Sequence, residues 1–225
     1  ALPGVRFRLG SIEATEIDEA LVDLLVESDG ALAPHLHVPL QSGSDPVLRR
    51  MRRWHSREQY RTRVLEIAGR GSPLGLGADV IAGFPGETPE DQGATRELIE
   101  ELPFTYLHVF PWSPRSGTHA ATLADRVEVG TAAARARELR EIGVRKGTAY
   151  ATTRIGGAAL VAVETPDSGL TGDYLRVRLR GADEVPGTLG RFRLAGTATD
   201  LKAGTGATGR AALPVLEATA PGSDS

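Results

Sequence analysis

A glycine-rich segment, residues 77–88, carries the most informative set of chemical groups in the chain. It has the sequence Gly-Ala-Asp-Val-Ile-Ala-Gly-Phe-Pro-Gly-Glu-Thr and ends an apolar run. Glycines let the backbone approach a ligand closely, Ile81 could pack on a flat heterocycle, and Asp79 could bond to polar ligand groups. The alternative is a tight strand-to-helix turn without a ligand, which the segment taken alone favours. A phosphate-binding loop is excluded, because no Gly-Lys-Ser or Gly-Lys-Thr follows.

A second candidate is the segment 37–45, where neutral polar groups follow an apolar run. Gln41 and Ser42 offer donors and acceptors that can orient a ligand at little desolvation cost. The same segment could instead cap the next helix through Ser44 or the residue after it, with Pro46 at the first helical position. The two interpretations are evenly balanced.

Metal chemistry in this chain would have to depend on histidine. There is no cysteine, so disulfides, thiolate zinc sites and cysteine nucleophiles are excluded. None of the five histidines lies in a His-Glu-x-x-His pattern. His35 and His37 point to one face of the same predicted strand, but a pair without a third ligand nearby is a poor metal site. We therefore expect no metal ligands in the chain.

An arginine and an aromatic loop complete the candidates in the first two-thirds of the chain. Arg53 precedes a capped helix and could bind a carboxylate through two hydrogen bonds, although a plain surface arginine fits equally well. Residues 108–118 combine Phe110, Trp112 and Arg115 in a loop after a strand. The aromatic rings could stack on an adenosine or wall off a reactive pocket, or they could simply fill a barrel interior.

Basic side chains alternate with aliphatic ones near the end of the chain. Tyr174, Arg176, Arg178 and Arg180 alternate with aliphatic residues, and period-two geometry puts them on one face of a strand. Such a face can bind phosphates and stack a base, each phosphate contact adding salt-dependent affinity. A solvated face of a half-buried sheet is the alternative, and we favour RNA binding because acids are sparse on that strand.

The elements that position these groups alternate between strands and helices up to about residue 150. Strands are predicted at Val5–Leu9, His35–Leu40, Leu76–Ile81 and Tyr106–Pro111. Helices are predicted to begin near Thr15, at Ser56 with a capping box to Gln59, at Thr88-Pro89, and over Val129–Tyr150. This alternation predicts an α/β fold with a parallel sheet. Four strands are too few to close a (β/α) barrel, so we expect residues 1–150 to form part of one.

Helical spacing disappears after residue 150. Short strands separated by Gly, Pro and Asp are predicted at Ala158–Val163, Tyr174–Arg180, Gly190–Ala195 and Thr208–Leu216. They predict a small antiparallel β-barrel, similar to an OB fold, over residues 151–213. The small polar residues 214–225 are predicted to be a flexible tail.

Composition limits the possible partners. The formal net charge is −3 and 40% of residues are hydrophobic, so nucleic-acid binding would need local geometry rather than bulk charge. No apolar run approaches the roughly 18 residues that a membrane span requires, and we expect a cytoplasmic protein without a membrane partner. The chain begins with Ala1 rather than Met, which we interpret as truncation, processing or an expression boundary.

Four motifs in order resemble the radical-SAM methylthiotransferases. They are Ser11-Ile12-Glu13, residues 37–44 (His-Val-Pro-Leu-Gln-Ser-Gly-Ser), residues 79–88 and residues 108–118. Residues from about 153 to 212 resemble the TRAM domain, an RNA-binding β-barrel. The resemblance implies a partial radical-SAM barrel followed by a TRAM barrel, with S-adenosyl-L-methionine (SAM) and tRNA as cofactor and partner.

Within that family, residues 9–13 and 108–110 look closest to the branch that acts on threonylcarbamoyladenosine. The implied reaction adds a methylthio group to carbon 2 of N6-threonylcarbamoyladenosine at position 37 of tRNA. Gly10 and Trp112 depart from the residues usual in that branch. The alternatives are action on isopentenyladenosine tRNA or on a ribosomal protein, and a non-catalytic RNA-binding module.

The resemblance also implies site roles and a missing part. The family's two 4Fe–4S clusters are held by cysteines that are absent here, so we expect the chain to be inactive alone. Residues implied on the SAM or substrate side are Glu13, Gln41, Ser42, Arg53, Asp79, Ile81 and Phe110, with Trp112 and Arg115 nearer the substrate. We expect Gln41, Ile81 and Phe110 to converge on one nucleoside-sized cavity.

Overall fold

The α/β part is built on three parallel strands. The computed structural model describes residues 5–28, 30–71, 73–180, 184–198 and 215–220. Strands β1 (His35–His37), β2 (Gly75–Ala82) and β3 (Tyr106–Pro111) form one sheet in the order β1-β2-β3, with β2 in the middle. Both pairings are parallel, which confirms the predicted α/β class with a parallel sheet.

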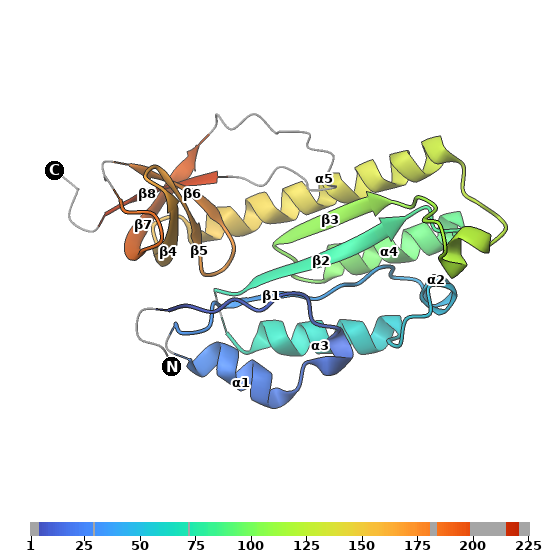
Figure 1. Ribbon diagram of the computed structural model, residues 1–225, viewed down its shortest axis with the longest axis horizontal. Coiled ribbons are helices and arrows are strands. Elements are labelled where there is room, and N and C mark those ends of the chain that lie inside the picture. Colours follow the sequence, from blue (N-terminus) through green and yellow to red (C-terminus); the bar gives the residue numbers. More distant parts are fainter. Residues whose placement is uncertain (1–4, 29, 72, 181–183, 199–214, 221–225) are drawn as a thin grey trace.

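Helices connect these strands and cover one face of the sheet (Figure 1). They are η1 (Ala14–Glu16), α1 (Glu19–Glu27), α2 (Asp45–Arg50), α3 (Arg57–Gly69), α4 (Pro89–Glu101), η2 (His119–Thr122) and α5 (Val129–Arg154). The predicted capping box of Ser56 and Gln59 is present at the start of α3. Pro89 begins α4 as predicted, and Thr88 forms a capping box there with Asp91.

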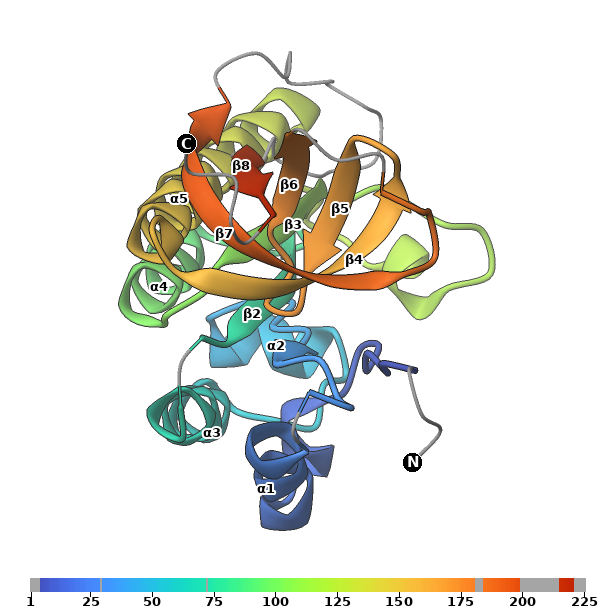
Figure 2. The same cartoon turned by 90° about the vertical axis from the view of Figure 1, so that its left-hand side faces the viewer.

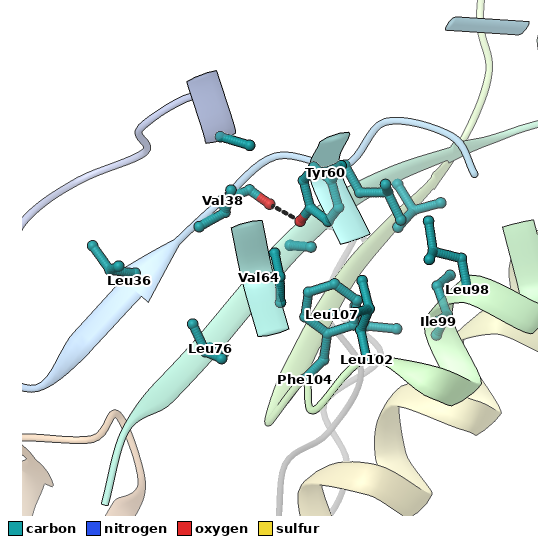
Figure 3. Close-up of a cluster of buried hydrophobic side chains, with 14 of the residues drawn as sticks. Leu36, Val38, Tyr60, Val64, Leu76, Leu98, Ile99, Leu102, Phe104 and Leu107 are labelled. Carbon is teal, nitrogen blue, oxygen red and sulfur yellow. Dashed lines mark hydrogen bonds between the residues drawn. The ribbon is translucent and has the colours of Figure 1, made fainter. Parts of the chain in front are cut away.

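The core lies between the sheet and these helices (Figure 3). Leu36, Val38 and Leu76 from the sheet face Tyr60 and Val64 of α3 in this cluster. The Tyr60 ring is fully buried, and its hydroxyl donates a hydrogen bond of 2.6 Å to the Val38 carbonyl. A buried hydroxyl with a partner avoids the desolvation penalty of an unpaired one, so Tyr60 can fill the core and also fix the end of β1.

The first predicted strands are shorter than expected. The segment predicted as Val5–Leu9 makes only an isolated bridge from Phe7 to Leu32, flanked by two backbone hydrogen bonds. The predicted strand His35–Leu40 ends at His37, because Pro39 has no N–H for the ladder and Gln41 adopts a positive φ of 65°. Asp18, and not Thr15, caps α1 by accepting from the Leu21 N–H.

Helix α5 leads from the sheet to a small closed barrel (Figures 1 and 2). Its strands are β4 (Ala158–Thr165), β5 (Ser168–Thr171), β6 (Arg176–Arg180), β7 (Leu189–Ala198) and β8 (Val215–Thr219), closing in the order β4-β5-β6-β8-β7. Four of the five pairings are antiparallel, as predicted, whereas the β6–β8 pairing is parallel. The barrel is therefore mostly, but not entirely, antiparallel.

Two predictions about the barrel strands were wrong. Strand β5 was missed, although Pro166-Asp167 marks the two-residue turn before it. Residues 217–219 were predicted only as part of a flexible tail, but they belong to β8, in which Val215, Leu216 and Ala218 are buried. Most of the predicted strand Thr208–Leu216 lies outside the described residues.

Asp173 links the barrel to the last turns of α5. Its carboxylate is 2% exposed, and one oxygen accepts from the Tyr150 hydroxyl (2.7 Å) and from Arg154 Nε (2.8 Å). Helix α5 therefore has to extend beyond the predicted end at Tyr150, since Arg154 is its last residue. Removing the carboxylate would leave the Arg154 guanidinium, whose side chain is 14% exposed, and the partly buried Tyr150 hydroxyl without this partner.

We predict that Asp173→Ala lowers the free energy of unfolding by about 3–5 kcal/mol, because it breaks a buried ion pair by removing one partner. Urea unfolding followed by circular dichroism measures this. Glu164→Ala is the control, since Glu164 pairs with Arg176 at the exposed surface, where such a pair contributes about 0–1 kcal/mol. Equal losses in the two variants would show that Asp173 does not hold the two parts together.

Candidate functional site

The parallel register of β2 and β3 aligns side chains on the face of the sheet that the helices leave uncovered. Asp79 lies opposite His108, and Ile81 lies opposite Phe110. In a strand every second residue points to the same face, so these two pairs form successive layers. Phe110 is 38% exposed and Ile81 is partly exposed. The outer layer is therefore apolar and accessible, at the carboxyl ends of the strands.

A cavity of about 260 Å³ adjoins that outer layer. It is lined by Ile81, Phe84, residues 50–53 and residues 118–120. Gln41 and Phe110 are not among the lining residues, although the Ile81 N–H donates to the Gln41 carbonyl (2.9 Å). The expected convergence of Gln41, Ile81 and Phe110 on one cavity is therefore met only for Ile81, with Phe110 beside it in register.

Glu13 and Arg53 meet at this edge of the sheet. Arg53 Nη1 donates to Glu13 Oε1 at 2.8 Å, and His55 Nδ1 lies 3.8 Å from the other Glu13 oxygen. Both side chains of the ion pair keep about a third of their surface exposed, and Arg53 also lines the cavity. The sequence prediction placed both residues on the ligand side; the structure brings them into contact with each other, and Arg53 also lines the cavity.

Ser42 has a different position from the one predicted. It is 1% exposed, its hydroxyl lies 3.2 Å from the Thr95 hydroxyl, and it accepts from the Ser44 N–H at 3.2 Å. These contacts hold the loop after β1 against helix α4. The hydroxyl has no surface left for a ligand, so the prediction that Ser42 contacts the cofactor is wrong.

The turn after β2 is held by a buried carboxylate. Gly83 has a φ of 75°, and a Cβ there would lie 2.3 Å from the Ala132 side chain, so only glycine fits. Both Glu87 oxygens lie 3.1 Å from the Gly83 N–H, and Arg135 donates to Glu87 at 2.7 Å. The sequence alone did not identify this pair, because Arg135 is distant in the chain.

The loop after β3 packs through aromatic contacts at one residue and is exposed at another. The Trp112 ring lies edge-on to Phe84 at 6.2 Å, and the Arg126 guanidinium lies 6.0 Å from the Trp112 ring centre. Arg115 is exposed. Trp112 therefore closes one side of the region around Phe84, while Arg115 remains accessible on the surface.

Asp79 is the centre of a polar layer beneath Ile81 and Phe110. His37 Nε2 and His108 Nδ1 each lie 3.2 Å from the same oxygen, Asp79 Oδ1. Burial alone would raise the pKa of Asp79, but the hydrogen bonds from the two histidines outweigh it and hold the pKa well below its ordinary value. Sequence reasoning noted His37 and missed its contact with Asp79, which joins different strands.

A hydrogen-bonded chain continues from this layer into the interior. His37 Nδ1 lies 3.0 Å from the Tyr106 hydroxyl, which lies 2.8 Å from His35 Nε2. Burial, and then the nearby charges of Arg8 and His37, lower the pKa of His35 to about 3, so it is neutral. His35 Nδ1 is buried without a partner, and an unpaired acceptor costs less than an unpaired N–H. We therefore assign donation from His35 to Tyr106 to His37 to Asp79.

Tyr174 closes the bottom of this polar interior. Its ring stacks on His35 (4.6 Å between ring centres) and lies 4.8 Å from Tyr106, and the Arg8 guanidinium lies 5.1 Å from its centre. It precedes β6 and has a φ of 71°. The prediction that Tyr174 shares a face with the arginines of β6 is therefore wrong, because this backbone turn directs its ring against the sheet.

The arginines of β6 alternate as predicted. Val177 and Leu179 are buried, while Arg176 and Arg180 are exposed. Two acids reduce the charge of this face, since Arg176 pairs with Glu164 at 3.0 Å and Arg180 pairs with Glu217 at 2.5 Å. Among the described residues, Arg178 has no carboxylate partner.

The next strand adds two further cations. Arg191 and Arg193 of β7 are exposed on either side of the buried Phe192. The accessible positive charge of the small barrel therefore comes from Arg178, Arg191 and Arg193 more than from the paired arginines.

Comparison with known proteins gives one family match and several relatives. Residues 5–99 match the Radical SAM superfamily. The chain is 34% identical over 198 residues to the threonylcarbamoyladenosine tRNA methylthiotransferase MtaB of Bacillus subtilis (strain 168), covering 84% of this chain and 44% of that protein. The corresponding protein of Rickettsia prowazekii (strain Madrid E) is 37% identical, covering 77% and 41%.

Another relative belongs to a different group of tRNA-modifying enzymes. The tRNA-2-methylthio-N(6)-dimethylallyladenosine synthase of Desulfitobacterium hafniense (strain Y51) is 35% identical, with 75% of this chain and 40% of that protein covered. The chain thus spans less than half of each of these relatives. Among solved structures, coproporphyrinogen III oxidase (HemN) of Escherichia coli superposes with a TM-score of 0.51 at 20% identity, over 63% of this chain and 32% of that one. That likeness supports the fold alone.

We predict that His35 makes the protein less stable in acid. The unfolded state takes up a proton near pH 6.5 and the folded state does so only near pH 3, so folding loses up to about 1.4 kcal/mol for each pH unit between them. Urea unfolding at pH 7, 5.5 and 4 should show the advantage of the wild type over His35→Gln shrinking as pH falls. A difference between the wild type and His35→Gln that stays constant with pH would contradict the assignment.

Proposed function

Because this chain belongs to the radical-SAM methylthiotransferase family, we propose that it forms part of an enzyme that adds a methylthio group to an adenosine of tRNA. The observation that carries the proposal is the extent of the similarity to MtaB. That similarity covers 84% of the chain. The part that precedes the small barrel, residues 1–157, makes up only about 70% of the 225 residues. The match must therefore extend from the α/β part into the barrel.

For the substrate we propose N6-threonylcarbamoyladenosine at position 37, with addition at carbon 2. Proteins named for that reaction in Bacillus subtilis, Rickettsia prowazekii and Aquifex aeolicus are 34–37% identical to this chain. The second candidate is the dimethylallyladenosine reaction, because proteins named for it reach 35% and 37% identity.

In this proposal the accessible outer layer of the sheet binds SAM. Ile81 and Phe84 give the 260 Å³ cavity an apolar surface, and Arg52 and Arg53 bring positive charge to its edge. The flat adenine ring of SAM would pack on the apolar surface of Ile81 and Phe84. The carboxylate of the methionine part of SAM would pair with Arg52 or Arg53. The side chains of this chain would bind and orient the cofactor and keep water away from it, while bound SAM would supply the family's radical chemistry.

The iron–sulfur part of that chemistry does not fit the residues of this chain. Iron–sulfur clusters are held by cysteine thiolates, and the sequence contains no cysteine. Any cluster would therefore need ligands from outside these 225 residues, and the residues described above contribute only the binding surface.

The small barrel is proposed to be a TRAM-type RNA-binding domain. Its closed five-stranded form, the exposed Arg191 and Arg193 and the partly exposed Arg178 support this, since arginines bind phosphates. Among the described residues, no helix is long and apolar enough to cross a bilayer.

Nucleoside analysis tests the proposed reaction. We predict that tRNA from cells lacking the gene that encodes this chain loses the methylthio form of threonylcarbamoyladenosine and accumulates the precursor, as measured by mass spectrometry. Re-expression of the gene should restore the modified nucleoside. Loss of the methylthio form of isopentenyladenosine instead would favour the second candidate, and no change in either nucleoside would contradict the proposal.

The RNA surface makes a separate prediction. The double variant Arg178→Glu with Arg191→Glu should bind transcribed tRNA about tenfold or more weakly and lower the salt dependence of binding by about two counterions, because each arginine would contact one phosphate. Arg96→Glu with Arg145→Glu is the matched control, since it makes the same charge change at exposed positions of α4 and α5. Equal effects in the two double variants would argue against a specific RNA face.

A further inference from the structure

Three side chains from three adjacent strands bring possible metal ligands together. His37 comes from β1, Asp79 from β2 and His108 from β3. One ligand atom from each lies within 4.8 Å of the other two, and both imidazole nitrogens lie 3.2 Å from Asp79 Oδ1. The sequence offered only His35 as a second ligand beside His37. In the structure the other two ligands are Asp79 of β2 and His108 of β3.

The spacing of these atoms matches a coordination shell. Divalent zinc binds histidine nitrogen and carboxylate oxygen at about 2.0–2.1 Å, so neighbouring ligand atoms lie about 2.8–3.0 Å apart in octahedral geometry and about 3.3–3.4 Å apart in tetrahedral geometry. The two separations of 3.2 Å to Asp79 Oδ1 are close to the tetrahedral spacing, and the two histidine nitrogens lie within 4.8 Å of each other. A cation could enter between the three groups with small side-chain rotations and without a shift of the strands.

The surroundings hold the ligands in place and leave the site open. The side chains of His37 and His108 are 9% and 16% exposed, so their rings have little freedom, whereas Asp79 is 30% exposed. The other nitrogen of His37 contacts the Tyr106 hydroxyl at 3.0 Å. A ligating histidine commonly makes such a bond, which orients the ring and raises its basicity.

We propose that His37, Asp79 and His108 bind a divalent first-row transition-metal ion, with Zn²⁺ as the reference case. Two neutral imidazoles and one carboxylate suit zinc or iron(II) and leave coordination positions for water or a ligand. Those positions would face the exposed outer layer formed by Ile81 and Phe110. The proposal rests on the geometry of the three strands and is independent of the proposed function.

Metal binding would reverse the hydrogen-bonded chain. His37 and His108 would each move a proton to their other nitrogen, which changes no charge, and His37 Nδ1–H would then donate to Tyr106. The Tyr106 hydroxyl would donate to His35 Nε2, and the His35 proton would move to Nδ1, which lacks a partner. The free energy of metal coordination must exceed the cost of these proton shifts. Tyr106 should therefore influence the metal affinity although it does not touch the ion.

The test uses the 225-residue chain, free of any affinity tag and treated with a chelator. Zn²⁺ is titrated by calorimetry and Co²⁺ by visible absorption, which is simple to interpret because there are no thiolates. We expect one ion per chain, and affinity at least about tenfold lower in Asp79→Asn and in His108→Ala. Tyr106→Phe should weaken binding about tenfold, and Asp167→Asn, which makes the same change as Asp79→Asn at an exposed carboxylate of the small barrel, should leave it unchanged.

Circular dichroism establishes that each variant is folded before it is scored. If His108→Ala does not fold, His108→Gln takes its place, because it keeps the volume and a polar end. The proposal is overturned if the wild-type chain binds neither Zn²⁺ nor Co²⁺ in a saturable way. It is also overturned if folded Asp79→Asn and the histidine variant bind as tightly as Asp167→Asn does.

Discussion

The parallel register of β1, β2 and β3 is the constraint on which the core and the candidate site both depend. It sends Leu76, Ala78 and Val80 to the helices, where they are buried. The alternate residues, Asp79 and Ile81, therefore lie on the other face, opposite His108 and Phe110. A slip of one residue would exchange the two sets. It would bury the carboxylate of Asp79 in the hydrocarbon core, so the register is strongly fixed.

The small barrel packs against the polar side chains of the sheet. Tyr174 covers the His35 and Tyr106 rings, and Arg8 donates to the Thr171 and Gly172 carbonyls at 2.9 and 3.0 Å. Asp173 binds the end of α5 next to them. The residues between β5 and β6 thus support the polar interior of the sheet, which fixes where the arginines of the barrel lie relative to the cavity.

Local signals predicted much of the fold, and contacts distant in sequence account for what was missed. The capping box at Ser56, the strands β2 and β3 and the alternation on β6 follow from neighbouring residues. The contact of His37 with Asp79 and His108 joins residues on separate strands, which no local pattern encodes. Ser42 looked accessible from its place after a strand, but packing against Thr95 buries it.

Ring-to-ring nuclear Overhauser effects in the intact chain test the register most directly. The parallel register predicts contacts between His37 and His108, whose ring centres are 5.3 Å apart, and between each of these rings and Tyr106. If His108 instead showed contacts only to core residues such as Leu98, the strands would be out of register. The shared polar layer, and the site built above it, would then not exist.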